Sequence, residues 1–218
     1  TLDDMLLRVN LNPGAADIVA QEGATDLGGG ELLGVIDNEP SINNSGDFAY
    51  SVETNAATTS DDLAVKNIGG VSTVIGREGN PDGFGNTIAT SVTTWSILNS
   101  GDVFWGHLLS STAANDQETL IRQSAFDSIV ARANDTATTS APTNQVGGSS
   151  FPWKLFNSGS NIGQLCAMSP DGAHVLIHGD LEGGTTDPDA LAVDGAIVIM
   201  DGSTIGTLPG TVTTINSA

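Results

Sequence analysis

The stretch Asn44-Ser45-Gly46-Asp47-Phe48-Ala49-Tyr50-Ser51-Val52 decides the fold of this chain, because its pattern occurs twice. The same order of residue types returns 55 residues later as Asn99-Ser100-Gly101-Asp102-Val103-Phe104-Trp105-Gly106-His107. Asn and Gly accept positive φ, so Asn-Ser-Gly-Asp favours a tight turn, and the apolar run that follows favours a β-strand. Each copy therefore predicts a β-hairpin.

A looser third copy of the turn phrase lies at Pro170-Asp171-Gly172-Ala173-His174. We expect the three phrases to form equivalent turns, with these candidate turn residues: Asn44, Gly46, Asn99, Gly101 and Gly172. Counted from the turn glycines, His107 and His178 take the same place in successive units, so equivalent strand positions are expected for them.

A second phrase keeps nearly the same spacing and predicts a second hairpin in each unit. Residues 18–23 match residues 74–79, and residues 129–132 match them again. A recurrence at a fixed spacing indicates an array of small structural units. The expected second hairpins pair residues 5–9 with 16–20, 63–66 with 72–76, 119–122 with 127–131, and 196–200 with 204–208.

Two hairpins per period make a four-stranded antiparallel unit. The strands after the turns are apolar or small on both faces, whereas a sheet with one solvated face alternates apolar and polar residues. Sheets covered on both sides favour an all-β, β-propeller-like array of four-stranded antiparallel repeats of about 55 residues. A β-sandwich is the alternative. Residues 1–218 are expected to be one propeller-like repeat domain, which belongs to a longer array or closes one unit with its two ends.

The residues around the first turn and the second hairpin resemble a known family, the bacterial Asn-x-x-Gly-x-x-Ala-Phe tandem-repeat proteins. Asn43-Asn44-Ser45-Gly46-Asp47-Phe48-Ala49-Tyr50 is similar to the first phrase of that family. Arg77-Glu78-Gly79-Asn80-Pro81-Asp82-Gly83 is similar to its second phrase, and Gln21-Glu22-Gly23 is a weaker copy. The resemblance implies an exported protein, often with a sorting or anchoring tail, and implies no specific chemistry.

Acidic residues dominate the charge of this chain, which has 26 Asp and Glu against 6 Lys and Arg and a formal net charge of −20. Nucleic acids and anionic membrane surfaces are bound through Lys and Arg, so the composition argues against both as partners. A strongly acidic protein fits an extracellular or cell-surface location, and the expected partners are other protein subunits or surface polysaccharide.

The candidate cation ligands are acids of the segment 180–194, because oxygen-rich loops suit Ca²⁺, which makes calcium the candidate cofactor. They are Asp180, Asp187, Asp189 and Asp194, and a weaker set is Asn80, Asp82 and Asn86. The alternative for both sets is a solvated loop. The single cysteine, Cys166, lies in an apolar run and is expected to be a buried, unreactive thiol.

No catalytic signature stands out in the chain, and in particular there is no Gly-x-Ser-x-Gly nucleophile elbow. The leading functional hypothesis is a non-enzymatic exported repeat module with a structural or adhesive role in a cell-surface or extracellular assembly. A carbohydrate- or protein-binding propeller is the second hypothesis, and a propeller hydrolase is the third.

Overall fold

The computed structural model describes residues 4–9, 14–28, 30–36, 40–89, 92–109, 118–133, 153–155, 166–181, 189–202 and 210–212. Within these ranges every element is a β-strand, so the all-β prediction is confirmed. Since no described segment is helical, none forms a long apolar helix of the kind that crosses a membrane.

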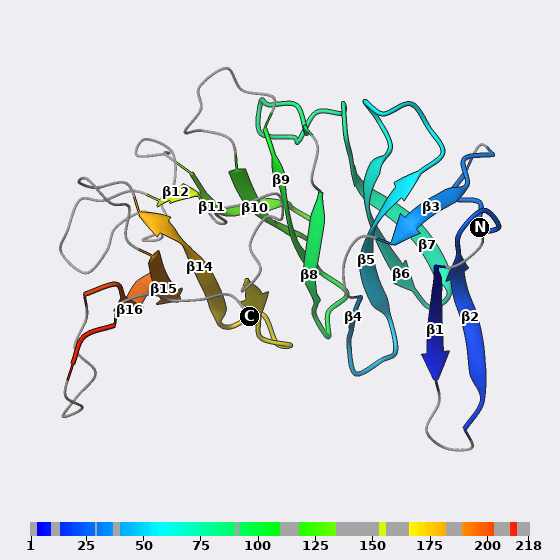
Figure 1. Cartoon of the computed structure of the whole chain (residues 1–218). Helices are drawn as coiled ribbons and strands as arrows, with labels where there is room; N and C mark the ends of the chain where they lie inside the picture. Colours follow the sequence, from blue (N-terminus) through cyan, green and yellow to red (C-terminus); the bar gives the residue numbers. More distant parts are fainter. Residues whose placement is uncertain are drawn as a thin grey trace.

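Three antiparallel sheets follow one another along the chain, preceded by a two-stranded hairpin (Figure 1). The N-terminal hairpin consists of β1 (Met5–Val9) and β2 (Ala16–Gln21). The first sheet consists of β3 (Leu33–Ile36), β5 (Phe48–Thr54), β6 (Asp62–Ile68) and β7 (Val71–Arg77), with the short β4 (Ser41–Ile42) paired to β5.

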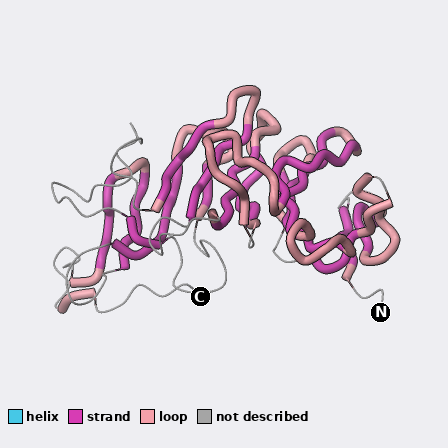
Figure 2. Tube along the Cα trace, turned by 90° about the horizontal axis from the view of Figure 1, so that it is seen from above, coloured by secondary structure: helices cyan, strands magenta, loops and turns pink. Residues whose placement is uncertain are grey.

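The second sheet has four strands, and the third repeats the five-stranded arrangement of the first. The second sheet consists of β8 (Thr93–Ile97), β9 (Val103–Leu108), β10 (Glu118–Gln123) and β11 (Ser128–Arg132). The third consists of β12 (Trp153–Leu155), β14 (Val175–Leu181), β15 (Asp189–Val193) and β16 (Ala196–Met200), with β13 (Ala167–Met168) paired to β14. Seen from above, the sheets lie side by side along a curved path (Figure 2).

A separate hydrophobic core lies at each junction between neighbouring sheets. Tyr50 and Val65 of the first sheet pack against Ala20 of the N-terminal hairpin. On the opposite face of the first sheet, Ala49 packs with Trp105 of the second sheet. A third core brings the second and third sheets together, with these buried members among others: Phe104, Leu120, Ala131, Ile177, Ala190 and Ala192. The first and second sheets are therefore buried on both faces, as their apolar pattern predicts.

A β-bulge recurs at the same place in the outer hairpin of every sheet. The pairing shifts by one residue between Leu6 and Leu7, between Ala64 and Val65, between Leu120 and Ile121, and between Leu191 and Ala192. The unpaired residues on the partner strands are Val19, Ile75, Val130 and Val198. A bulge bends its strand and increases the twist locally, so the four hairpins share one shape.

The fourth of these hairpins uses a turn that was not predicted from the sequence. Residues 196–200 pair with Asp189–Val193 across Asp194 and Gly195, so they form the second strand of this hairpin. Residues 204–208, with which they were expected to pair, lie outside the described residues. Both Asp194 and Gly195 have positive φ, which is the geometry of a type I′ hairpin turn. The segment 180–194, which holds the candidate cation ligands, begins inside β14 and includes the whole of β15.

Candidate functional site

The predicted turn glycines all adopt the left-handed backbone conformation. The φ angles of Gly46, Gly101 and Gly172 are 81°, 84° and 72°. Each turn connects the short or first strand of a sheet to the central strand that follows it, so the three turns lie at the same end of successive sheets.

The turns of neighbouring sheets are hydrogen-bonded to one another. The backbone N–H of Asn44 donates to Oδ1 of Asn99 at 3.1 Å, and the N–H of Asn99 donates to the carbonyl oxygen of Pro170 at 2.8 Å. Asn43 adds a buried bond from its side-chain amide to the carbonyl oxygen of Leu98 at 2.9 Å. The three turns therefore form a continuous chain of polar contacts between the three sheets.

Serine hydroxyls make a second set of corresponding contacts just inside the turns. The N–H of Ile97 donates to Oγ of Ser41 at 3.0 Å, and the N–H of Met168 donates to Oγ of Ser96 at 3.1 Å. In both cases the serine belongs to one sheet and the amide to the next. These bonds fix how far each sheet is displaced along its neighbour.

The third turn contains one more residue than the other two, and this corrects the expected match of His107 and His178. The closing backbone bond runs from Asn43 to Asp47 in the first turn but from Ser169 to His174 in the third. His178 therefore corresponds to Gly106, one position before His107. Since successive side chains of a strand point to opposite faces, the two histidines do not form a matched pair.

Each of the three histidines has its own setting. His107 is fully buried, its Nδ1 lies 2.8 Å from the carbonyl oxygen of Leu108, and burial lowers its pKa. His178 is also buried, and its Nε2 has no hydrogen-bond partner among the described residues. His174 is exposed and forms a 2.7 Å contact with Asp194, which raises the pKa of His174.

The structure does not bring the candidate calcium ligands into one cluster. Asp180 and Asp189 lie directly opposite each other on β14 and β15. Asp194 lies at the other end of β15, where it contacts His174. Asp187 lies outside the described residues. Within the part of the chain that the structure describes, no three His, Cys, Asp or Glu residues are arranged to hold a metal ion.

The weaker candidate set around Asp82 builds a turn. Oδ1 of Asp82 accepts hydrogen bonds from the N–H groups of Phe84 and Asn86, at 2.7 and 2.9 Å, and Oδ2 accepts from the Asn86 side chain. Cys166 is buried, as expected, and burial raises the pKa of its thiol to about 12. Burial therefore disfavours the thiolate, which is the nucleophilic form of cysteine.

Glu78, which is buried, and Asp201, which is partly buried, lie at corresponding places after the last strand of a sheet. No role for either carboxylate was predicted from the sequence. The N–H of Glu78 donates to the carbonyl oxygen of Asp62, and the N–H of Asp201 donates to that of Asp189. One carboxylate oxygen of Glu78 and one of Asp201 are buried without a hydrogen-bond partner among the described residues. Burial, followed by the nearby carboxylates of Asp61 and Asp62, raises the pKa of Glu78.

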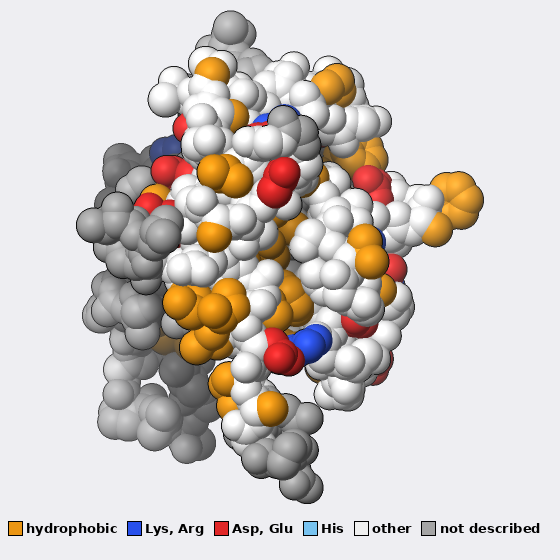
Figure 3. All heavy atoms as spheres, turned by 90° about the vertical axis from the view of Figure 1, so that its right-hand side faces the viewer, with side chains coloured by type: hydrophobic (Ala, Val, Ile, Leu, Met, Phe, Trp, Pro, Cys, Tyr) orange, Lys and Arg blue, Asp and Glu red, His pale blue; other side chains and the backbone are white. Residues whose placement is uncertain are grey.

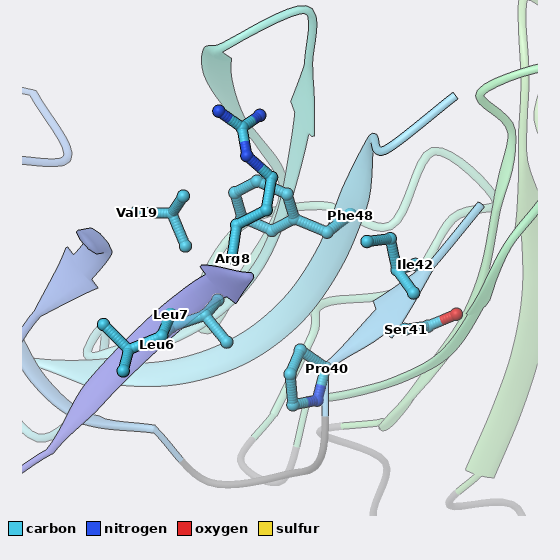
Figure 4. A pocket seen from close by; sticks show the side chains of 8 residues that line it. All are labelled: Leu6, Leu7, Arg8, Val19, Pro40, Ser41, Ile42 and Phe48. Carbon is cyan, nitrogen blue, oxygen red and sulfur yellow. The ribbon is translucent and has the colours of Figure 1, made fainter. Parts of the chain in front are cut away.

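A small apolar pocket lies between the N-terminal hairpin and the first sheet (Figure 4). Its volume is about 130 Å³, and its walls come from β1, β2, β4 and β5. The lining residues are Leu6, Leu7, Arg8, Val19, Pro40, Ser41, Ile42 and Phe48. The Arg8 guanidinium at its rim contacts Asp17 at 3.2 Å. Such a pocket suits an apolar side chain better than a sugar ring, which needs converging polar groups.

No protein-family model, curated protein or solved structure matches this chain.

Proposed function

We propose that this protein is a non-enzymatic exported repeat module with a structural or adhesive role in a cell-surface or extracellular assembly. The observation that supports the proposal most is the way in which successive sheets are joined. Each junction has its own apolar core, and a turn contact and a serine contact join the first sheet to the second and the second to the third at corresponding places. Sheets joined in this way make a stiff body whose outer loops are free to vary.

The fine architecture of the proposal is a propeller-like array in which each sheet is one blade of about 55 residues. The resemblance to the Asn-x-x-Gly-x-x-Ala-Phe tandem-repeat proteins fits this assignment. A sandwich of two sheets accounts less well for the second sheet, which packs against neighbours on both of its faces. The proposed partners are other protein subunits or surface polysaccharide.

Fractionation of the source cells tests the role in an assembly. Antibodies raised against the chain should detect it in the surface or extracellular fraction, in a form that sediments until the assembly is dissociated. A chain found only as a dispersed protein inside the cell would contradict the proposal. Chromogenic glycosides and esters test the non-enzymatic part, and turnover that survives purification to constant specific activity would contradict it.

A binding role is the second candidate, and the pocket between the N-terminal hairpin and the first sheet favours it. Because this pocket is lined mainly by apolar side chains, the expected ligand is a protein side chain and not a polysaccharide. Binding to glycan surfaces can be compared for the wild type and for Ile42→Asp, which places a charge at the exposed rim of the pocket. If both proteins bind glycans equally, the binding site lies elsewhere and not in this pocket.

A further inference from the structure

The outer face of the N-terminal hairpin carries exposed apolar side chains in a row. Met5, Leu7 and Val9 alternate along β1, and Ile18 of β2 lies opposite Leu7. Their exposed fractions are 44%, 49%, 54% and 58%. Figure 3 looks toward this end of the molecule and shows hydrophobic side chains at the surface. We refer to these four residues as the head face.

The backbone pairing shows what covers the corresponding positions in the following sheets. Leu7 pairs with Ile18 just beyond the bulge, as Val65 pairs with Val74 in the first sheet and Ile121 with Ile129 in the second. Val65 and Ile121 are buried, because the preceding hairpin or sheet packs over them. In the first and second sheets, the residue that corresponds to Leu7 is therefore covered by the preceding hairpin or sheet.

The bulge residues show the complementary side of each junction. Val19, Ile75 and Val130 each pack into the core shared with the sheet that follows. Val198, the fourth bulge residue, is 59% exposed on β16 of the third sheet. We refer to the surface around Val198 as the tail face. The head face thus carries the residues that a preceding sheet covers at the internal junctions. The tail face carries the bulge residue that a following sheet covers.

From this we infer that two copies of the chain associate head to tail, with the tail face of one copy packed against the head face of the next. The inference rests on the proposed function, since it names the partner in the assembly as a second copy of this chain. The contact is heterologous, because different surfaces meet, and such contacts build open arrays or closed rings. It removes from water the same kind of apolar surface that the internal junctions bury.

Sedimentation velocity of the whole chain at increasing concentration tests the inference. The wild-type protein should form species that grow beyond the dimer. Leu7→Glu blocks the head face and Val198→Glu blocks the tail face, so each variant alone should sediment as a monomer of about 22.1 kDa. A mixture of the two variants retains one intact head face and one intact tail face, and should therefore form a dimer that does not grow further.

Phe126→Glu is the matched control, because Phe126 is 89% exposed in the β10–β11 turn and belongs to neither face. It should associate as the wild type does, and circular dichroism should show the same β-sheet signal for all variants. A wild-type protein that stays monomeric at every concentration overturns the inference, as does a mixture that stays monomeric. A monomeric chain still recovered in the surface assembly would leave the proposed function standing, whereas a head-to-tail oligomer found only inside cells would contradict that function alone.

Discussion

The side-chain amide of Asn43 donates a 2.9 Å hydrogen bond to the carbonyl oxygen of Leu98, so the first turn is bonded to the second across 55 residues of sequence. The same amide reaches Asp47, while Oδ1 of Asn43 accepts from the N–H groups of Ser45 and Asp47. One buried side chain therefore holds its own turn closed and joins it to the neighbouring sheet.

Replacing Asn43 by Ala should destabilise the protein by about 1–3 kcal/mol, since the Leu98 carbonyl and two turn amides lose their buried partner. The loss is measured by urea unfolding. Asn44→Ala is the control, because the bond from Asn44 to Asn99 uses the backbone N–H of Asn44, and it should change stability by less than about 0.5 kcal/mol. Equal effects of the two substitutions would show that the bond across the junction contributes nothing measurable.

Alanine at the turn glycines should cost different amounts at different turns. All three have positive φ, so each substitution carries a backbone penalty of about 1 kcal/mol. An added Cβ at Gly46 meets no atom within 4 Å, whereas one at Gly172 lies 3.0 Å from the Arg122 guanidinium and from Leu98. In thermal unfolding, Gly172→Ala should therefore have a lower melting temperature than Gly46→Ala. The reverse order would contradict the packing of the third turn against the second sheet.

Gly76 leaves room for Trp105 at the junction of the first and second sheets. An added Cβ at Gly76 would lie 2.5 Å from the Trp105 ring, which is buried. Gly76→Ala should destabilise the protein by about 1–3 kcal/mol through overpacking, with a change in tryptophan fluorescence. A double-mutant cycle with Trp105→Phe isolates the contact, because the penalty should shrink when the ring is smaller. If Gly76→Ala destabilises the wild type and the Trp105→Phe variant equally, the loss of stability comes from the β7 backbone and not from the contact with the ring.

Glu78 should make stability depend on pH. Burial and nearby carboxylates raise its pKa in the folded state, so the folded protein binds the proton more tightly than the unfolded chain does. Stability is then greatest below the unfolded pKa and falls as pH rises toward the folded pKa. Glu78→Gln should therefore stabilise the protein at pH 7 and change little near pH 4. Glu53→Gln removes one exposed charge and controls for net charge. Parallel pH profiles for Glu78→Gln and the wild type would contradict the buried acid.

The net charge of −20 should make the fold more stable in salt. Folding brings the acids closer together, and raising ionic strength from about 0.01 M to about 0.1 M shortens the Debye length from about 30 Å to about 10 Å. The thermal midpoint should rise with NaCl over this range. Choline chloride at the same ionic strength is the control for ion-specific effects, and a midpoint that stays flat in both salts would argue against general repulsion.

Turn chemistry allowed much of the fold to be predicted, but one hairpin turn was missed. Asp194-Gly195 and Asp201-Gly202 flank the same apolar strand, and a hairpin was predicted from the sequence only at the second pair. The structure closes a hairpin across Asp194-Gly195, with Asp189–Val193 as its first strand. This strand was missed because it begins in a segment rich in acids and glycines, which hides its apolar alternation.

The site residues were harder to predict. The phrase containing Glu78 recurs in the sequence, but the burial of Glu78 beside Asp61 and Asp62 depends on how β6 and β7 pair. The acids of the segment 180–194 looked like one cluster because they are close in sequence. A strand separates Asp189 from Asp194, and it carries them to opposite ends of the sheet.

The longer third turn has a consequence for how such a chain tolerates changes in length. Ala173 adds one residue between Gly172 and β14, yet Met168 pairs with Val175 as Ile97 pairs with Val103 in the second sheet. The turn therefore absorbs the extra residue, and β14 keeps its register. A slip of one residue inside the strand would instead turn every following side chain to the other face. A change of one residue in length is thus compatible with this architecture when it falls in a turn of this kind.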